Sequence, residues 1–370
     1  MPLRVLVADD SSLFRRAVAE ALGSIPDVEV VGSSPNGRLA LQKVVELKPD
    51  LLTLDIEMPE MDGLAVLEAL RQMGSTTSVI VISAVTLRGG RLTMQALEKG
   101  AFDFITKPQG RSSEESKATL VKELTPRLRA LAHRRQIRSI LQPGSPGLST
   151  RAATPSTVAP SKSTVRPERA SGVRASRPEI VLIGVSTGGP AALVRLLPPI
   201  PKDIGVPIVI VQHMPPVFTQ SLAESLSSKC SLQVREATDG EKLEAGTVLI
   251  APGGRQLKLA VGPDGATRTQ ISDDPPENNC RPAVDYLFRS AANQVPGRAM
   301  AVILTGMGND GTLGLRLLRR HGCFSIAQDE ATSVVFGMPK SAIDAGLVDV
   351  VLPIDGIAAR ILSTVKGRGT

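Results

Sequence analysis

The amino-acid sequence predicts two α/β domains, each a doubly wound parallel sheet, joined by a disordered linker. A length of 370 residues exceeds one ordinary compact core. Apolar runs rich in β-branched residues alternate with helical patterns in both halves, which is typical of βαβ units. Between them, Ser, Thr, Pro, Arg and Ala dominate from about residue 139 to 178 without apolar periodicity. We therefore expect domains at 1–135 and 178–370 and a linker at 136–177.

The first half shows the expected alternation of elements. Its predicted strands are 3–8, 51–54, 79–82 and 102–105, with a weaker strand at 28–31. The helix after the first strand has one apolar stripe, formed by Leu13, Phe14, Ala17, Val18, Ala21 and Leu22. Arg15, Arg16 and Glu20 should face away from that stripe. A last amphipathic helix at about 114–135 closes the domain.

Polar residues follow the strands of this half at the carboxyl ends, where parallel sheets bind ligands. Asp9 and Asp10 follow the first strand, Asp55 the third, Ser83 the fourth and Lys107 the fifth. Three converging carboxylates are suitable ligands for Mg²⁺. One of them can accept a phosphoryl group while Lys107 and Ser83 neutralise the charge on the transferred oxygens. The sequence therefore predicts a phosphorylation site among these carboxylates at the sheet edge.

These residues, with DIEMPEMDG around Asp55 and KP at Lys107, resemble the receiver domain of response regulators. The resemblance covers residues 1 to about 130 and implies a flavodoxin-like fold. It implies that a partner histidine kinase phosphorylates Asp55 and that Ser83 and Phe104 move when it does so. Phe104 stands where many members of the family have tyrosine, so the moving ring here lacks a hydroxyl.

The second half opens with EIVLIGVSTGGPAALVRLL, which predicts a strand, a tight glycine turn and a helix, with Ser186 at the turn. Taken alone, Ser186 fits a helix N-cap or a phosphate-binding loop equally well. The strand-like run VPIVIVQHM, however, ends in His213, and RAMAVILTGMGNDG ends in a loop carrying Asp310. All three side chains should leave a parallel sheet at the same edge, which favours a catalytic triad.

The chemistry that this triad predicts is acyl transfer. His213 removes the proton of Ser186, which attacks an ester carbonyl, and Asp310 fixes the histidine tautomer. Backbone amides at the start of the helix after Ser186 and in the loop 306–308 can hold the oxyanion. The chain order Ser, His, Asp differs from the Ser, Asp, His order of α/β-hydrolases, so we expect another fold. With seven Phe, one Tyr and no Trp, the chain suits an exposed polymer side chain better than a bulky aromatic substrate.

A second resemblance rests on GVSTGGP, VQHMPPVFT, IAPGG, RPAVDYLF, LTGMGNDG and AQDEATSVVFGMP. Residues 178 to about 364 resemble the catalytic domain of chemotaxis protein-glutamate methylesterases, which implies a Rossmann-like domain without a catalytic cofactor. The family hydrolyses γ-glutamyl methyl esters on chemoreceptors and often deamidates receptor glutamines. The resemblance implies that Ser186, His213 and Asp310 are the triad, that Thr187 adjoins the nucleophile, and that the Met307 amide helps to hold the oxyanion.

The resemblance also implies partners and regulation. Methylated chemoreceptors are the expected substrates, and a chemotaxis-type histidine kinase is the expected phosphodonor. We expect a cytoplasmic monomer in which the unphosphorylated receiver covers the Ser186 edge. Gln256 and Cys280 depart from the pattern, because members of the family carry histidine at both positions. These departures bear on receptor preference more than on the chemistry.

Charge and composition exclude several other classes. Residues 134–178 carry nine Lys or Arg and one acid, a net +8, whereas the whole chain carries +7, so the rest is near neutral. No aromatic residue interleaves these arginines, so we expect a solvated tether and no nucleic-acid partner. No apolar run approaches the roughly eighteen residues of a membrane span, which predicts no membrane insertion.

The cysteines and histidines limit the metal chemistry that we expect. Cys230, Cys280 and Cys323 lie far apart in the sequence without metal-ligand spacing, so we expect free thiols and no zinc site. The chain has only three histidines, and His133 and His321 lack the catalytic neighbours of His213.

Two rival functions remain open on the sequence alone. One is a response regulator whose output domain only binds, with Ser186 as a loop cap. The other is a hydrolase of small esters that the receiver controls allosterically.

Overall fold

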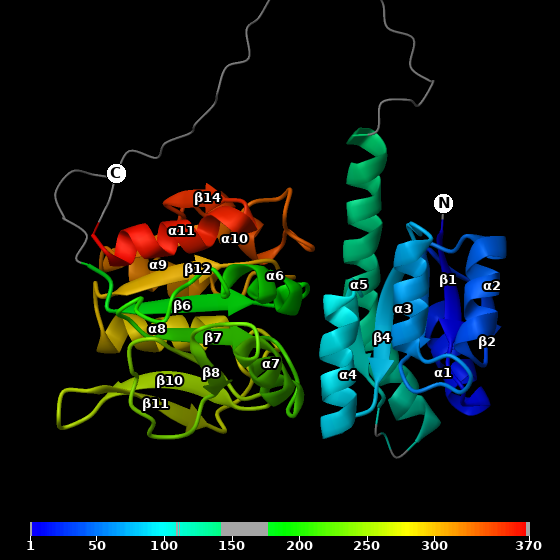
Figure 1. Cartoon of the computed structure of the whole chain (residues 1–370), viewed down its shortest axis with the longest axis horizontal. Helices are drawn as coiled ribbons and strands as arrows, with labels where there is room; N and C mark the ends of the chain where they lie inside the picture. The colour runs from blue at the N-terminus through cyan, green and yellow to red at the C-terminus, as the bar shows by residue number, and fades with distance from the viewer. Residues whose placement is uncertain (1, 109, 111, 142–176, 368–370) are drawn as a thin grey trace, which may run out of the picture.

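The computed structural model describes residues 2–108, 110, 112–141 and 177–367 of the chain. They form two α/β domains that pack against each other, with α4 and α5 of the first domain beside α6 and α7 of the second (Figure 1). Most of the predicted linker lies outside the described residues.

The N-terminal domain is a five-stranded parallel sheet of order β2-β1-β3-β4-β5. Its strands are β1 (Leu3–Ala8), β2 (Val28–Ser34), β3 (Leu51–Asp55), β4 (Ser78–Ser83) and β5 (Asp103–Thr106). Its helices are α1 (Ser12–Gly23), α2 (Gly37–Leu47), α3 (Gly63–Gln72), α4 (Leu87–Glu98) and α5 (Ser113–Leu141). Apolar residues of α1 and α5 cover one face of the sheet, and those of α2, α3 and α4 cover the other. The doubly wound prediction is confirmed.

Three details of this domain differ from the sequence prediction. Leu13 is 81% exposed, because the first turn of α1 lies beyond the carboxyl end of β1. Arg15 is half-buried instead of facing away, and its guanidinium donates to the backbone carbonyls of Asp9 and Asp10 at 2.8 and 3.2 Å. Helix α5 continues to Leu141, beyond the expected end near residue 135.

The C-terminal domain has a seven-stranded parallel sheet of order β14-β13-β12-β6-β7-β9-β8. The strands are β6 (Ile180–Val185), β7 (Ile208–Gln212), β8 (Gln233–Glu236), β9 (Thr247–Ile250), β12 (Ala299–Ile303), β13 (Phe324–Gln328) and β14 (Val350–Leu352). An antiparallel hairpin, β10 (Gln256–Val261) and β11 (Thr267–Ser272), packs beside it. The central strands are buried on both faces, which explains their continuous apolar sequences.

Helices cover both faces of this sheet as well. The helices are α6 (Gly189–Leu196), α7 (Phe218–Ser227), α8 (Val284–Gln294), α9 (Thr312–Arg320), α10 (Met338–Asp344) and α11 (Ile354–Val365). The strand order reverses at β6, since β7 pairs with one edge of β6 and β12 with the other. Ligands bind at such a switch point in open α/β sheets, and Ser186, His213 and Asp310 follow the three strands that meet there.

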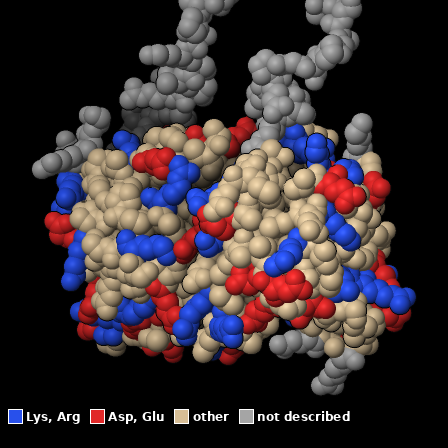
Figure 2. Space-filling view, turned by 45° about the vertical axis from the view of Figure 1, so that its right-hand side comes forward, with Lys and Arg blue, Asp and Glu red and all other residues tan. Residues whose placement is uncertain are grey.

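Charged side chains of both signs are mixed on the face of the molecule that Figure 2 shows. On the side shown in Figure 2, Lys and Arg alternate with Asp and Glu over both domains, in keeping with the near-neutral charge predicted for the folded parts. In the described part of the chain, no helix has the length and apolar character that a membrane span requires.

Candidate active site and phosphorylation site

Ser186 stands in the tight turn between β6 and α6, as its sequence predicted. Its amide donates to the carbonyl of Thr305 at 3.0 Å, and its carbonyl accepts from Nε2 of Gln212 at 3.0 Å. Gly188 has a φ of +78°, and a Cβ there would lie 2.4 Å from Cβ of Val334. The turn therefore requires glycine at 188 for both conformation and space.

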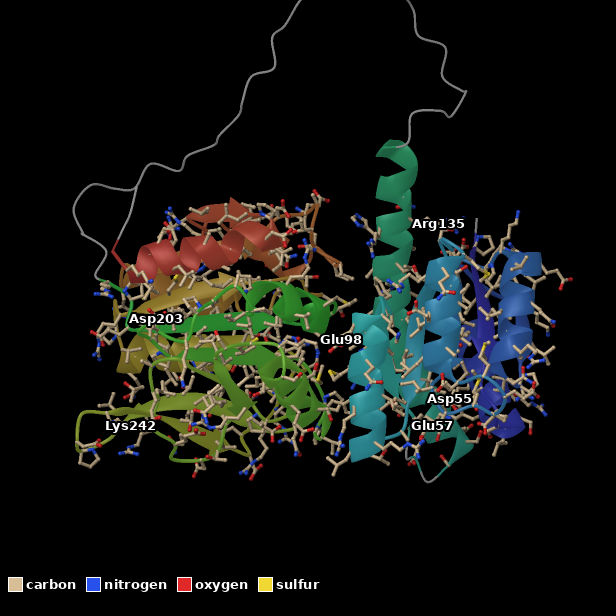
Figure 3. The ribbon with its side chains drawn as sticks, viewed as in Figure 1. Asp55, Glu57, Glu98, Arg135, Asp203 and Lys242 are labelled. Atoms are coloured by element: carbon tan, nitrogen blue, oxygen red, sulfur yellow. The ribbon has the colours of Figure 1, made fainter. Side chains whose placement is uncertain are left out.

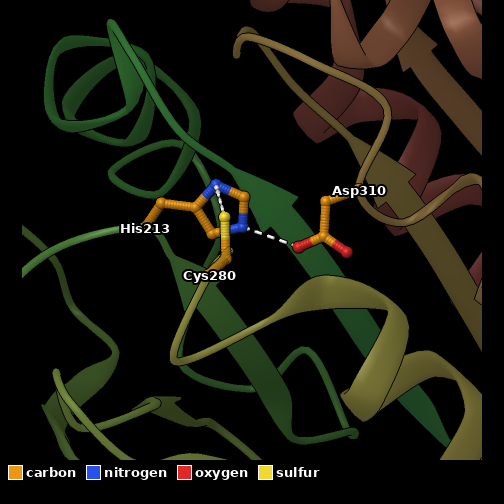
Figure 4. A group of neighbouring side chains, drawn as sticks. All are labelled: His213, Cys280 and Asp310. Atoms are coloured by element: carbon orange, nitrogen blue, oxygen red, sulfur yellow. Dashed lines mark hydrogen bonds and ion pairs between the residues drawn. The ribbon is translucent and has the colours of Figure 1, made fainter. Parts of the chain in front are cut away.

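His213 and Asp310 form a close pair at the same sheet edge (Figure 4). Nε2 of His213 lies 2.7 Å from Oδ2 of Asp310, and the histidine side chain is 12% exposed. Because Nε2 faces the carboxylate, Nδ1 is the nitrogen left to act as a base toward Ser186. Within the described residues the Ser186 hydroxyl makes no hydrogen bond to His213, so productive contact between them needs a movement of the side chains.

The Asp310 carboxylate is held from several directions. It accepts hydrogen bonds from the amides of Val284 (2.7 Å), Asp285 (2.9 Å) and Gly311 (3.0 Å) and from Nδ2 of Asn278 (3.0 Å). Burial raises the pKa of Asp310, but the bonds from His213 and the backbone amides outweigh it and lower the pKa. Asp310 is therefore a fixed, ionised partner for the imidazole.

The pKa of His213 is raised to about 9. Burial alone lowers it, but the hydrogen bonds and charges of Asp310 and Cys280 outweigh the burial. The imidazole therefore carries a proton at neutral pH in this conformation and becomes a free base only in alkaline solution.

Cys280 was not predicted as part of this site, yet its Sγ lies 3.6 Å from Nδ1 of His213 (Figure 4). The fully buried Gln256 fixes the segment that carries it, donating to the carbonyls of Pro275 (3.1 Å) and Cys280 (3.4 Å) and accepting from the Ala283 amide (2.9 Å). Of the two departures from the family pattern, Cys280 therefore lies beside His213, and Gln256 supports the segment that carries Cys280. Their departure from the family pattern was the only signal in the sequence that pointed to Gln256 and Cys280.

Asn278 and Asp285 form a second layer that sequence reasoning also missed. Nδ2 of Asn278 donates to both Asp285 (2.9 Å) and Asp310 (3.0 Å), so it bridges two carboxylates. Burial and the charge of Asp310 raise the pKa of Asp285 to about 6, although the Gly314 amide opposes them. The bridge screens the repulsion between the two acids.

Two backbone amides stand near the nucleophile without an intramolecular partner. In the part of the chain that the structure describes, the N–H groups of Thr187 and Met307 donate no hydrogen bond. Gly306 permits the close approach of the Met307 loop, because a Cβ there would lie 2.8 Å from Cβ of Ser186. Such amides are the donors that an oxyanion needs.

The acidic cluster of the N-terminal domain assembles as expected. Oxygens of Asp9, Asp10 and Asp55 lie within 4.8 Å of one another, a set of hard donors that fits Mg²⁺. Nζ of Lys107 lies 2.9 Å from Asp9 and 2.7 Å from Asp55. Burial raises the pKa of Asp55, and so does Asp9, while Lys107 opposes them. Ser83 is buried beside this cluster's strand end, with its hydroxyl 3.3 Å from the Gly89 carbonyl.

The active-site edge lies against the N-terminal domain. The ring of Phe104 stacks on Phe218 of α7 at a centroid distance of 4.7 Å. The Thr187 hydroxyl donates to Oδ2 of Asp103 at 3.0 Å, and Arg127 pairs with the same oxygen at 2.9 Å. The neighbour of Ser186 is thus hydrogen-bonded to the other domain.

Charged and apolar contacts extend this interface. Glu98, which Figure 3 shows between the domains, accepts from Nζ of Lys229 at 2.8 Å. Arg91 of α4 lies 3.8 Å from Glu224 of α7. Val334 and Val335, from the loop beside Ser186, pack on the apolar cluster that α1 and α5 form with the N-terminal sheet.

The chain is similar to known proteins over both domains. Residues 5–117 match the family model "Response regulator receiver domain", and residues 181–361 match "CheB methylesterase". A protein-glutamate methylesterase/protein-glutamine glutaminase of Desulfotalea psychrophila is 49% identical over 98% of this chain and 99% of its own. A protein of the same description from Trichodesmium erythraeum is 42% identical over 97% and 98%.

Solved structures match the domains separately. The CheB methylesterase catalytic domain of Thermotoga maritima is 46% identical, with a TM-score of 0.49, over 50% of this chain and 98% of its own. The response regulator domain of Thermotoga maritima CheB is 39% identical, with a TM-score of 0.30, over 33% and 93%. From its full-length relatives and its two domain matches, the chain belongs to the CheB-type protein-glutamate methylesterase/protein-glutamine glutaminase family, with an N-terminal receiver domain and a C-terminal methylesterase domain.

Proposed function

We propose that this enzyme hydrolyses glutamyl methyl esters of chemoreceptors, and deamidates receptor glutamines, through a Ser186, His213 and Asp310 triad. The His213–Asp310 pair, beside Ser186 at the switch point of the sheet, is the observation that carries the proposal. The pairing leaves only Nδ1 to serve as the base. It also sets the orientation in which the imidazole must meet the serine hydroxyl.

The reaction has two halves. Nδ1 of His213 takes the Ser186 proton as Oγ attacks the ester carbonyl, and the Thr187 and Met307 amides hold the oxyanion. As the bond to the leaving group breaks, His213 gives the proton to the methoxide oxygen, which leaves as methanol, or to the amide nitrogen, which leaves as ammonia, and a glutamyl ester remains on Ser186. Water, activated by His213, then releases the receptor glutamate and restores the serine. Asp310 stabilises the imidazolium in both halves.

The receiver domain supplies the signal. Asp55 accepts a phosphoryl group from a histidine kinase, with Lys107 and Ser83 placed to contact its oxygens. When bound by Asp9, Asp10 and Asp55, Mg²⁺ neutralises phosphoryl charge. These roles follow from the acidic cluster and the family rather than from any bound group.

In the docked arrangement, the receiver restricts access to the catalytic edge. Phe104 is both the expected switch residue and the residue stacked on Phe218, so any movement of its ring alters the interface. Asp103, its neighbour on β5, holds Thr187 beside the nucleophile. Phosphorylation of Asp55 should therefore release both contacts together.

Replacement of Ser186 by alanine tests the catalytic assignment. Methanol release from methylated receptor should fall by about three orders of magnitude or more, since the nucleophile is lost. Ser363→Ala, which changes a serine of α11 whose hydroxyl donates to the Arg360 carbonyl of the same helix, is the matched control and should keep the reaction. Retained methanol release by Ser186→Ala would exclude Ser186 and favour an output domain that only binds. Equal rates on methylated receptor and small free esters would favour the small-ester hydrolase.

A further inference from the structure

Cys280 and His213 stand together at the active site with no assigned role for the thiol. We propose that Sγ of Cys280 and Nδ1 of His213 bind Zn²⁺ or a divalent cation with the same ligand preference. The bound ion inhibits the esterase. The binding itself rests only on the geometry of this pair. The inhibition rests also on the proposed function, in which Nδ1 is the base.

The separation of the two donor atoms fits a shared zinc ion. Zinc lies about 2.3 Å from a cysteine sulfur and about 2.0–2.1 Å from a histidine nitrogen, so tetrahedral ligation separates the two by about 3.5 Å. The observed distance from Sγ to Nδ1 is 3.6 Å. The two atoms therefore need not move apart for an ion to bind both, but the Cys280 side chain must turn toward the ring plane, in which the Nδ1 lone pair lies.

Asp310 completes the arrangement found around zinc-binding histidines. Such a histidine donates its other ring N–H to a carboxylate, which fixes the tautomer and strengthens the ligand. Here Nε2 lies 2.7 Å from Oδ2 of Asp310, which leaves Nδ1 to bind an ion, and Sγ of Cys280 lies over the face of the ring beside Nδ1 (Figure 4). Sulfur, nitrogen and a supporting carboxylate form the group His213, Cys280 and Asp310, whose donor atoms all lie within 4.8 Å.

The backbone of Cys280 is also held in place before an ion arrives. The amide of Cys280 donates to the Glu277 carbonyl at 2.8 Å, and the Glu277 amide donates to the Cys280 carbonyl at 3.0 Å. Gln256 holds the same carbonyl from the buried side at 3.4 Å. Cys280 is half-buried, so solvent ions reach it. Binding forms a sulfur–zinc bond and a nitrogen–zinc bond, releases the proton of the Cys280 thiol and the Nδ1 proton of the imidazolium to solvent, and leaves water at the other positions.

Local spacing could not have shown this site, because the two ligands are 67 residues apart in the chain. The sequence expectation of no zinc site considered only neighbouring cysteines and histidines. An ion at Nδ1 occupies the lone pair that must receive the Ser186 proton. Zinc should therefore inhibit the esterase reversibly, and a chelator should restore the activity.

The test uses the full chain with excess Mg²⁺, so that the receiver carboxylates are occupied by a hard ion. Zn²⁺ affinity is measured by competition with a chromophoric chelator, and Co²⁺ substitution is followed by the thiolate-to-metal absorption band. The variants are Cys280→Ala, Cys280→Ser, the control Cys230→Ala, which changes another half-buried free thiol, and Ser186→Ala. Inhibition of methanol release is compared with the zinc-free rate of each variant.

The proposal expects one Zn²⁺ bound with a cobalt–thiolate band in the unmodified chain, Cys230→Ala and Ser186→Ala. Both Cys280 variants should lose the band and at least about tenfold in affinity. Equal affinity of Cys280→Ser and Cys230→Ala, or absence of the band from the unmodified chain, would overturn the site. Because Ser186→Ala has no esterase but should still bind zinc, failure of the ion site is distinguished from failure of the catalytic assignment.

Discussion

Each ring nitrogen of His213 has a different neighbour, and this decides what the residue does. Nε2 faces Asp310 at 2.7 Å, and Nδ1 faces Cys280 at 3.6 Å. The carboxylate favours the protonated ring, while the catalytic cycle needs the neutral ring. The raised pKa of His213 therefore lowers the fraction of the enzyme that has a free base, and it stabilises the imidazolium that forms in the transition state.

Asp310→Asn should reduce methanol release by about 10³- to 10⁴-fold, because an amide no longer fixes the tautomer or stabilises the imidazolium. The matched control is Asp264→Asn, which changes a surface acid paired with Arg268. The measurement is kcat on methylated receptor. A loss below about fivefold would show that Asp310 does not support the base.

The pKa of His213 predicts an alkaline rise of activity. Its value of about 9 means that protonated His213 predominates below that pH, so kcat/KM should rise with pH up to about 9. The groups that face His213 are Asp310 and Cys280, with Asp285 behind Asp310 through Asn278.

Cys280→Ala removes one cause of the raised pKa of His213. The acid limb of the pH profile of kcat/KM should therefore move to lower pH. Asp264→Asn should leave it in place. The pH profile of kcat/KM checks both. An acid limb near the ordinary histidine pKa of about 6.5 in the unmodified enzyme would contradict the assignment.

Sequence reasoning could place residues at one sheet edge where each of them follows a strand, and their catalytic roles stay predictions. Ser186, His213 and Asp310 follow β6, β7 and β12, which are adjacent in the sheet. Cys280 and Asn278 lie in a loop before α8, and no periodicity reveals the path of such a loop. Their position beside the base depends on tertiary contacts such as the buried Gln256.

At the scale of elements, α4 and α7 form the main contact between the domains. Gly90 of α4 faces Ser221 of α7, and a Cβ at Gly90 would lie 2.4 Å from Oγ and 3.3 Å from Cβ of that serine. The helices therefore approach closely only because residue 90 has no side chain. This contact offers a steric test of autoinhibition.

Gly90→Gln should separate the domains and raise the unphosphorylated esterase rate by at least about fivefold, the lower range of typical coupling. Gly23→Gln, at an exposed helix end with open space around it, is the control and should leave the rate unchanged. Both variants are checked for phosphorylation of Asp55 to confirm that the receiver is folded. An unchanged basal rate in Gly90→Gln would argue against inhibition through α4.

Element boundaries followed the sequence most closely in the strands. The buried runs of β1 and β3 were predicted almost to the residue, because strands of a parallel sheet covered on both faces are mostly apolar. The end of α5 was not, since its last turns continue into polar residues. The exposure of Leu13 shows that an apolar stripe predicts burial only where the sheet extends beneath it.

At the scale of the whole molecule, the active-site edge and the signalling surface are the same interface. One apolar cluster includes Phe104 of the receiver and Phe218 of the catalytic domain. The sequence predicted both domains, but not which faces meet, because complementary surfaces come from residues scattered over several elements. Occlusion was only a hypothesis from domain order and family resemblance. The docked arrangement supplies the contacts that this hypothesis needs, among them Phe104 with Phe218 and Asp103 with Thr187.

The most direct measurement is methanol release from methylated receptors by the full chain, with and without a small-molecule phosphodonor. Asp55→Asn, which cannot be phosphorylated at this position, is the matched control. The account predicts that the phosphodonor raises the rate of the unmodified enzyme by about fivefold or more and leaves Asp55→Asn unchanged. Equal rates with and without the phosphodonor, or equal stimulation of Asp55→Asn, would contradict gating of Ser186 by the receiver.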